Sequence, residues 1–140
     1  MSVPPQIGSD EELGRHVYSR RHAKRALRSS VPHHVFLIQE GKTRISVDRL
    51  GVAPLAEALA LAEANAADRG RAFYGWATVD ARTARRNDRY VAATPIPNTN
   101  PYHGDIVLPD SAAADREEQT RHAQELADAS RWRPRPGSLA

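Results

Sequence analysis

The stretch Thr43–Arg49, with the sequence TRISVDR, has the alternating pattern of a β-strand with one buried face. Its apolar residues, Ile45 and Val47, are separated by Ser46 and flanked by charged residues, so the pattern repeats at every second position. A period of two is typical of a strand that turns one side to a core and the other to solvent. We therefore expect a strand here.

The run before this strand, His34–Gln39 (HVFLIQ), is short and apolar, and Glu40-Gly41-Lys42 separates the two runs. A short connection that contains glycine is typical of a β-hairpin. We expect the two runs to pair antiparallel. Further runs with strand character lie at Ala72–Asp80, Arg89–Thr94 and Asp105–Leu108.

Three segments are expected to be helices. Pro54–Arg69 (PLAEALALAEANAADR) has proline at its start, Gly70 just after its end, and leucine and alanine side chains on one face. A second helix is predicted from Asp10 to Arg28, because a capping-box pattern opens at Ser9. The third predicted helix runs from about Ala112 to Arg131.

Two shorter segments complete the expected organisation. Asp80 can cap a short helical turn that ends near Arg86, and Pro95–Gly104 (PIPNTNPYHG) is too rich in proline and asparagine for regular structure. The order of elements predicts an α+β fold, with a small mixed or antiparallel sheet of about 4–5 strands and three helices. We expect one domain over residues 9–132, between a flexible lead at 1–8 and a flexible basic tail at 133–140.

Composition excludes several classes of protein. The 140 residues include no cysteine, so disulfides, thiolate zinc sites and cysteine nucleophiles are excluded. No apolar run is long enough to cross a membrane, and the first residues lack the charged and apolar regions of a signal peptide. We expect a cytoplasmic protein that makes no contact with a membrane.

The formal net charge of +3 is the remainder of opposite local charges. Residues 13–30 carry six basic residues and no acid, residues 110–128 carry six acids and two arginines, and residues 131–140 carry three arginines. Arginine supplies 18 of the 20 basic residues, a bias that a GC-rich genome also produces. The clustering, rather than the total, therefore indicates where an acidic partner would bind.

Four basic residues of the predicted N-terminal helix follow the spacing i, i+3, i+4, i+7 and would form one stripe: Arg21, Lys24, Arg25 and Arg28. Such a stripe can neutralise several phosphates of an external partner. It can also pair with the acidic segment at 110–128, or remain a solvated face. The sequence leaves these three alternatives open.

The end of the third predicted helix carries a second candidate for binding. Trp132 is expected to dock this helix on the domain. Alternatively, Trp132 with Arg131 and Arg133 forms an exposed binding element, since tryptophan and arginine dominate interface hot spots.

The sequence contains none of the patterns GxxxxGK[ST], GxGxxG, GxSxG and HExxH, which counts against the corresponding nucleotide-binding, hydrolase and zinc-protease chemistry. His103 precedes Asp105 by two positions, a spacing that places both side chains on one face of a strand. Asp105 could then orient the imidazole for acid–base catalysis, with His22, Arg49 and Tyr102 as helpers in phosphoester cleavage of RNA or transfer onto a nucleotide. Alternatively, His103 and Asp105, together with Asn98 and Asn100, hydrogen-bond the backbone of their own loop.

Other polar residues receive no catalytic role from the sequence. His16 and His22 would lie about 240° apart on the predicted helix, so they cannot share a ligand there. Ser46 and Asp48 share a strand face and are interpreted as decoration of a sheet edge. We expect no metal site and no cofactor.

Four pieces occur in order along the chain and together resemble a scattered group of short bacterial proteins. That group shares R-R near the start, L/I-S-V-D-R, N-P-x-H-A and a closing L-A-x-x-A-x-W; here the pieces are Arg20-Arg21, Ile45–Arg49, Asn100–Asp105 and Leu126–Trp132. Gly104 stands where the group has alanine. The group has no established activity, so the resemblance implies only one shared architecture.

Together these features predict a non-enzymatic bacterial accessory or interaction module. It would bind an acidic partner, a protein or a nucleic acid, through its basic N-terminal helix and its C-terminal helix, and a hetero-complex is consistent with that role. The alternative is a small metal-independent enzyme that acts on RNA or a nucleotide through His103.

Overall fold

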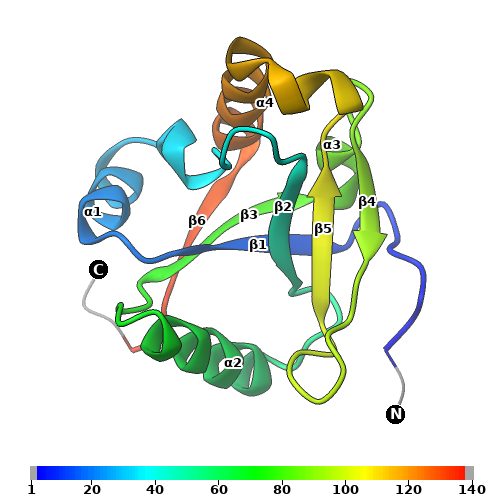
Figure 1. Cartoon of the computed structure of the whole chain (residues 1–140). Coiled ribbons are helices and arrows are strands. Elements are labelled where there is room, and N and C mark those ends of the chain that lie inside the picture. Colours follow the sequence, from blue (N-terminus) through cyan, green and yellow to red (C-terminus); the bar gives the residue numbers. More distant parts are fainter. Residues whose placement is uncertain (1–2, 138–140) are drawn as a thin grey trace.

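The computed structural model of the chain describes residues 3–137. Its centre is a six-stranded sheet in which every neighbouring pair is antiparallel (Figure 1). This confirms the predicted α+β class. In spatial order the strands are β4 (Tyr90–Ala93), β5 (His103–Val107), β2 (Arg44–Arg49), β1 (Glu12–Val17), β3 (Gly75–Asp80) and β6 (Arg131–Pro134).

Helices cover both faces of the sheet. Trp76 and Ala77 are neighbours in β3 and point to opposite faces, and each belongs to a different apolar cluster. One cluster packs beneath α2, and the other packs against α3 and α4 (Figure 1). The helices are α1 (Arg20–Arg28), α2 (Leu55–Asp68), α3 (Ala81–Ala84) and α4 (Arg116–Ala129), with short 3-10 helices at His33–Val35 and Asp110–Ala114.

Most of the predicted elements are present. The helix predicted over Pro54–Arg69 is α2, with Pro54 as its N-cap residue, and the runs predicted as strands at 43–49, 72–80 and 89–94 contain β2, β3 and β4. The run at 105–108 overlaps β5, which begins two residues earlier, inside the segment 95–104 that was predicted to be irregular. Asp80 caps α3 as expected, because its carboxylate accepts the N–H of Thr83 at 2.7 Å. The third predicted helix is α4, which begins only at Arg116.

The helix predicted over 10–28 is wrong in its first half. That half is β1, whose side chains at Leu13 and Val17 enter the core, and α1 begins only after Ser19, which caps it. β1 pairs with β3 over six residue pairs and also with β2. Pairing with two neighbouring strands outweighs the local capping signal, as tertiary context often does.

The predicted hairpin between 34–39 and 43–49 is also wrong. The first run forms a 3-10 helix and an irregular segment, and it buries Val35 and Phe36 in the core without joining the sheet. β2 pairs with β1 and β5 instead. The apolar run therefore contributes packing rather than strand pairing, because β1 occupies the position beside β2.

The predicted basic tail begins as a strand. β6 pairs with β3, and this close approach requires Gly75, whose φ is +149° and where an added Cβ would lie 2.5 Å from the carbonyl oxygen of Arg133. The predicted lead is packed as well, with Ile7 buried. Residues 1–2 and 138–140 of the two predicted flexible segments lie outside the described residues.

Within residues 3–137, no helix has the length and apolar character that crossing a membrane requires.

Candidate functional site

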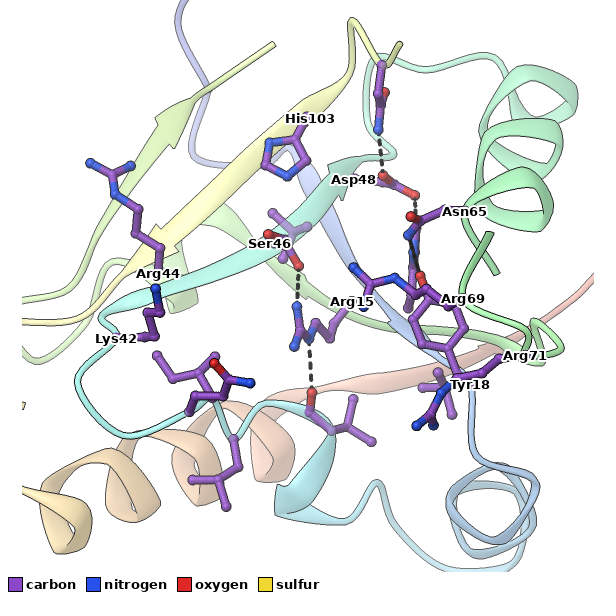
Figure 2. A pocket seen from close by; sticks show the side chains of 18 of the residues that line it. Arg15, Tyr18, Lys42, Arg44, Ser46, Asp48, Asn65, Arg69, Arg71 and His103 are labelled. Atoms are coloured by element: carbon purple, nitrogen blue, oxygen red, sulfur yellow. Dashed lines mark hydrogen bonds and ion pairs between the residues drawn. The ribbon is translucent and has the colours of Figure 1, made fainter. Parts of the chain in front are cut away.

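A groove opens where β1 and β2 separate. The two strands pair only at Leu13 with Arg49 and at Gly14 with Asp48. Beyond these pairs β1 stays paired with β3, and β2 stays paired with β5. The space between them has a volume of about 970 Å³ and is also lined by α2, the start of α1 and the loop before β5 (Figure 2). We call it the β1–β2 groove.

Arg15 spans the gap between the separating strands. Its Nε donates to the carbonyl oxygen of Val35 at 3.0 Å, and its Nη1 donates to that of Ser46 at 2.9 Å. The side chain thus satisfies a β2 carbonyl that strand pairing would otherwise reach. Burial lowers the pKa of Arg15, and within residues 3–137 no carboxylate forms an ion pair with it. Arg15 therefore holds a charge in the groove without a counterion.

Basic side chains outnumber acidic ones around the groove. Arg44 is paired with Asp105 at 3.2 Å, whereas Lys42, Arg69 and Arg71 form no ion pair in the described part of the chain. Figure 2 shows Arg69 and Tyr18 beside Arg15. The lining holds five basic groups, Arg15, Lys42, Arg44, Arg69 and Arg71, and two carboxylates, Asp48 and Asp68.

Asp48 is a buried carboxylate at one wall of the groove. It accepts hydrogen bonds from His16 Nε2 at 2.5 Å, from Trp76 Nε1 at 3.1 Å and from Asn100 Nδ2 at 3.3 Å. Burial opposes its charge, but the hydrogen bonds and the electrostatic influence of His16 outweigh burial and hold the pKa of Asp48 below its ordinary value. Gly14 leaves room for the indole, since a Cβ there would lie 2.8 Å from Trp76.

His16 connects this carboxylate to a phenol. Nδ1 of His16 lies 2.6 Å from the hydroxyl oxygen of Tyr18. In the tautomer whose Nε2 hydrogen faces the ionised Asp48, Nδ1 accepts the hydrogen bond of this hydroxyl. Asn65 of α2 donates to the same hydroxyl oxygen at 2.5 Å. Burial raises the pKa of Tyr18, while the Arg69 guanidinium, 5.7 Å from the ring centre, acts in the opposite direction. We call His16, Tyr18, Asp48 and Asn65 the His16 cluster.

His103 and Asp105 lie on one face of β5, as predicted, but they have different partners. His103 lines the groove, and its Nδ1 is 3.0 Å from the carbonyl oxygen and 2.9 Å from the hydroxyl of Thr94. Asp105 is buried and pairs with Arg44. The expectation that Asp105 orients the His103 imidazole is therefore wrong, because His103 bonds to Thr94, just after β4, and Asp105 bonds to Arg44 of β2.

The proposed helpers of His103 are dispersed. His22 lines the groove and stacks on His34 with ring centres 5.8 Å apart; burial, followed by the charge of His34, lowers the pKa of His22. Arg49 is buried and paired with Glu11 at 2.8 Å, away from the groove lining.

Tyr102 also lies outside the groove lining. Its hydroxyl donates to Glu57 of α2, and this hydrogen bond raises the pKa of Tyr102. The tyrosine thus ties the loop before β5 to α2. Of the sequence candidates for catalysis, the structure brings His22 and His103 to the groove and leaves Arg49, Tyr102 and Asp105 elsewhere.

The predicted basic stripe is present on α1, where all four of its side chains are exposed: Arg21, Lys24, Arg25 and Arg28. Among residues 3–137, none of them forms an ion pair, and the acidic helix α4 packs elsewhere, against the 3-10 helices and α3. The alternative in which the stripe pairs with the acidic segment is therefore not realised in this part of the chain.

Trp132 and Arg133 are engaged within the fold. Trp132 is half-buried and packs against the larger apolar cluster, as the docking alternative predicts. Arg133 is paired with Glu12 at 2.5 Å, and its guanidinium lies 5.8 Å from the ring centre of Trp76. Trp132 thus packs β6 against the core, and Arg133 ties β6 to β1.

Sequence reasoning missed the His16 cluster for a definable reason. In a helix His16 and Tyr18 point to different faces, whereas in a strand they share one, so the helix prediction over 10–28 separated them. Asp48 was expected at a sheet edge, but β2 is central. The alternation of Leu13 and Val17 with His16 and Tyr18 is the signal that could have revealed the strand.

Within the described residues, no three His, Asp or Glu side chains are arranged to hold a metal ion. No protein-family model, curated protein or solved structure matches the chain.

Proposed function

We propose that the protein binds single-stranded nucleic acid, with the phosphates held in the β1–β2 groove. The observation that carries this proposal is the set of basic side chains without a carboxylate partner in the described chain: Arg15, Lys42, Arg69 and Arg71. Arg15 is partly buried, and a partly buried guanidinium without a counterion is costly unless an anion neutralises it; the other three side chains are exposed and accessible to a ligand. Arginine also matches the planar geometry of a phosphate.

The distribution of charge favours a chain of phosphates over a single anion. The basic stripe of α1 begins beside the groove, where His22 belongs to the lining. The charges of Arg21 and Arg25 contribute to lowering the pKa of His22, so the field of the stripe extends to the groove. A strand that leaves the groove can therefore continue along α1, which agrees with the sequence-based expectation of an acidic partner there.

The shape of the groove favours a single strand over a duplex. Its volume of about 970 Å³ falls in the range of ligand-binding clefts, and α1, α2 and the loop before β5 border it. Unpaired bases also need flat groups on which to stack. The imidazoles of His22 and His34, already stacked on each other at the groove, provide such groups, and His34 is exposed.

The test is binding of fluorescein-labelled oligouridine and oligothymidine of about 12 nucleotides, followed by fluorescence anisotropy. The groove variant Arg69→Gln/Arg71→Gln is compared with the control Arg82→Gln/Arg121→Gln, which removes the same charge from exposed sites outside the groove. We expect the groove variant to bind about tenfold more weakly and the control to stay within about twofold of wild type.

Equal weakening in both variants would contradict the proposal, because it would reflect net charge alone. The proposal would also be contradicted if poly-glutamate displaced the oligonucleotide at equal charge concentration, because that result favours an acidic protein as the partner. A further variant, with Arg21, Lys24, Arg25 and Arg28 changed to alanine, tests the continuation along α1. It is expected to bind the oligonucleotide more weakly than wild type and to retain binding of a dinucleotide.

A further inference from the structure

We propose that Tyr18 is a nucleophile that attacks a phosphodiester bound in the β1–β2 groove and forms a covalent phosphotyrosyl intermediate. This inference rests on the proposed function, because the substrate is the nucleic acid held by the groove cations. It differs from the sequence-based alternative, which assigned catalysis to His103. The reacting oxygen is the hydroxyl that His16 and Asn65 hold.

The first argument is the position of a base. Nδ1 of His16 lies 2.6 Å from the Tyr18 hydroxyl oxygen, within the range required for proton transfer. Burial raises the pKa of Tyr18, so the phenol keeps its proton at neutral pH and needs a base at the moment of attack. In the His16 tautomer that donates from Nε2 to Asp48, Nδ1 presents a lone pair to the hydroxyl.

The second argument is the support of that base. Nε2 of His16 donates to Asp48 at 2.5 Å, and Trp76 and Asn100 fix the carboxylate from two other directions. The ionised Asp48 sets the tautomer of His16 and stabilises the imidazolium that forms when Tyr18 loses its proton. A nucleophile, a base and an orienting carboxylate in sequence are the arrangement that activates hydroxyl nucleophiles in unrelated folds.

The third argument is the surrounding positive charge. Asn65 donates to the phenolic oxygen, and the Arg69 guanidinium lies over the ring, so both groups favour a developing phenolate. Arg15 and Tyr18 are close enough for their charges to interact. Arg15 and Arg69 are therefore placed to hold the non-bridging oxygens of the phosphate that Tyr18 attacks.

The reaction balances without an added reagent. The Tyr18 oxygen forms a bond to phosphorus, and its proton moves to Nδ1 of His16. The bond between phosphorus and the leaving sugar oxygen breaks. That oxygen takes up a proton from a solvent water, and the His16 imidazolium returns its own proton to that water, so the ring becomes neutral again. The products are a phosphotyrosyl diester and a strand end with a free hydroxyl. Water or another hydroxyl can later displace the tyrosine.

The structural alternative is that the His16 cluster only ties α2 to β1. The readout that separates the two is the reactivity of Tyr18 toward phenylsulfonyl fluoride, which forms an aryl sulfonate ester on tyrosine and releases fluoride and a proton. The chain contains four tyrosines, and Tyr90 is 52% exposed, so it serves as the internal reference for an ordinary phenol. Peptide mapping by mass spectrometry measures the labelling rate at each position.

We expect Tyr18 to be labelled faster than Tyr90 although it is the less exposed of the two. His16→Gln should slow the labelling of Tyr18 about tenfold and leave that of Tyr90 unchanged. His122→Gln is the matched control, because His122 lies in a different buried cluster, and it should alter neither rate. Labelling of Tyr18 no faster than that of Tyr90 in the wild-type protein would overturn the inference.

The second measurement uses oligonucleotides labelled at either end, with the reaction stopped in dodecyl sulfate. We expect a covalent adduct with one of the two labels, and its loss in Tyr18→Phe, which should still bind the oligonucleotide. Binding without an adduct from either label refutes the nucleophile and leaves the proposed function intact. Absence of binding in the wild-type protein refutes the proposed function itself.

Discussion

Two clusters in this protein combine arginine, histidine and a carboxylate, and they differ in whether the arginine charge is neutralised. In the cluster between α3, α4 and β4, Arg89 is buried and donates to the carbonyl oxygens of Ala84 and Thr83, to His122 Nδ1 at 2.9 Å and to Glu125 at 3.0 Å. All three guanidinium nitrogens have partners within the fold, and one partner is a carboxylate.

In the β1–β2 groove, Arg15 donates only to backbone carbonyls, and Asp48 is bonded to His16 rather than to an arginine. The groove therefore keeps a positive charge that the fold does not neutralise. The same residue types thus stabilise the fold where their charges are paired, and form a candidate site where they are not. The predictions below separate the two clusters by stability and by binding.

The largest expected effect on stability is that of Arg89→Leu. The substitution leaves His122, Glu125 and two carbonyl oxygens without their donor, which should lower the free energy of unfolding by about 3 kcal/mol. Urea denaturation measures it. Oligonucleotide binding by the folded variant should match wild type. If Arg89→Leu weakened oligonucleotide binding as much as Arg69→Gln does, the two clusters would not be functionally separate.

The next effect is that of Asp48→Asn. The carboxylate accepts three hydrogen bonds, one of them from an imidazole, so its loss should lower the free energy of unfolding by about 2 kcal/mol. The asparagine no longer fixes the tautomer of His16. The labelling of Tyr18 should therefore slow, while that of Tyr90 stays constant. An unchanged Tyr18 rate in a folded Asp48→Asn protein would contradict the role of Asp48 in positioning His16.

The elements of the fold differ in how well the sequence predicts them. The alternation in Thr43–Arg49 predicts β2, and Pro54 with Gly70 predicts α2, because both signals are local. The sequence does not predict the strand β1, because the acidic residues after Ser9 have the pattern of a helix start. The strands that pair with β1 also lie far along the chain. Local patterns carry no information about such distant partners.

The candidate site also depends on residues that are distant in the sequence, so local patterns do not predict it. Its basic character was expected, but the expectation fell on α1 rather than on the groove. His16 and Tyr18 come from β1, Asp48 comes from β2, and Asn65 comes from α2. Only the pairing of β1 beside β2 brings these side chains together. A site assembled across three elements could therefore not be predicted while one of them was assigned as a helix.

A smaller effect is expected from the pH dependence of stability. Burial, followed by the charge of Arg89, lowers the pKa of His122, although Glu118 and Glu125 act in the opposite direction. The unfolded chain then binds more protons than the folded one, so this group lowers stability as pH falls from about 6.5 to its folded pKa, and adds nothing further below it.

The measurement is the urea midpoint at about pH 7 and pH 5, for wild type and for His122→Gln. The variant should lose less stability on acidification than the wild-type protein, because it lacks the titrating imidazole. Equal losses in the two proteins would mean that His122 does not resist protonation in the folded state, and that its bond from Arg89 is weak.

The smallest effect on stability is that of Arg69→Gln. Arg69 is exposed and has no ion pair in the described chain. The substitution should therefore change the free energy of unfolding of the protein by less than about 0.5 kcal/mol. Oligonucleotide binding should nevertheless weaken severalfold. Arg89→Leu and Arg69→Gln then form opposite cases, one lowering stability and the other lowering affinity. A large loss of stability in Arg69→Gln would remove this contrast.

The most direct test of the groove as a phosphate site is the salt dependence of oligonucleotide binding. The four basic side chains of the groove without a carboxylate partner should contribute about −3 to the slope of log K against log salt concentration, in addition to any contribution of the α1 stripe. Arg69→Gln/Arg71→Gln should reduce the magnitude of the slope by about 1.4. Arg82→Gln/Arg121→Gln should leave the slope at the wild-type value. A slope near zero, or the same reduction in both double variants, would contradict phosphate binding in the β1–β2 groove.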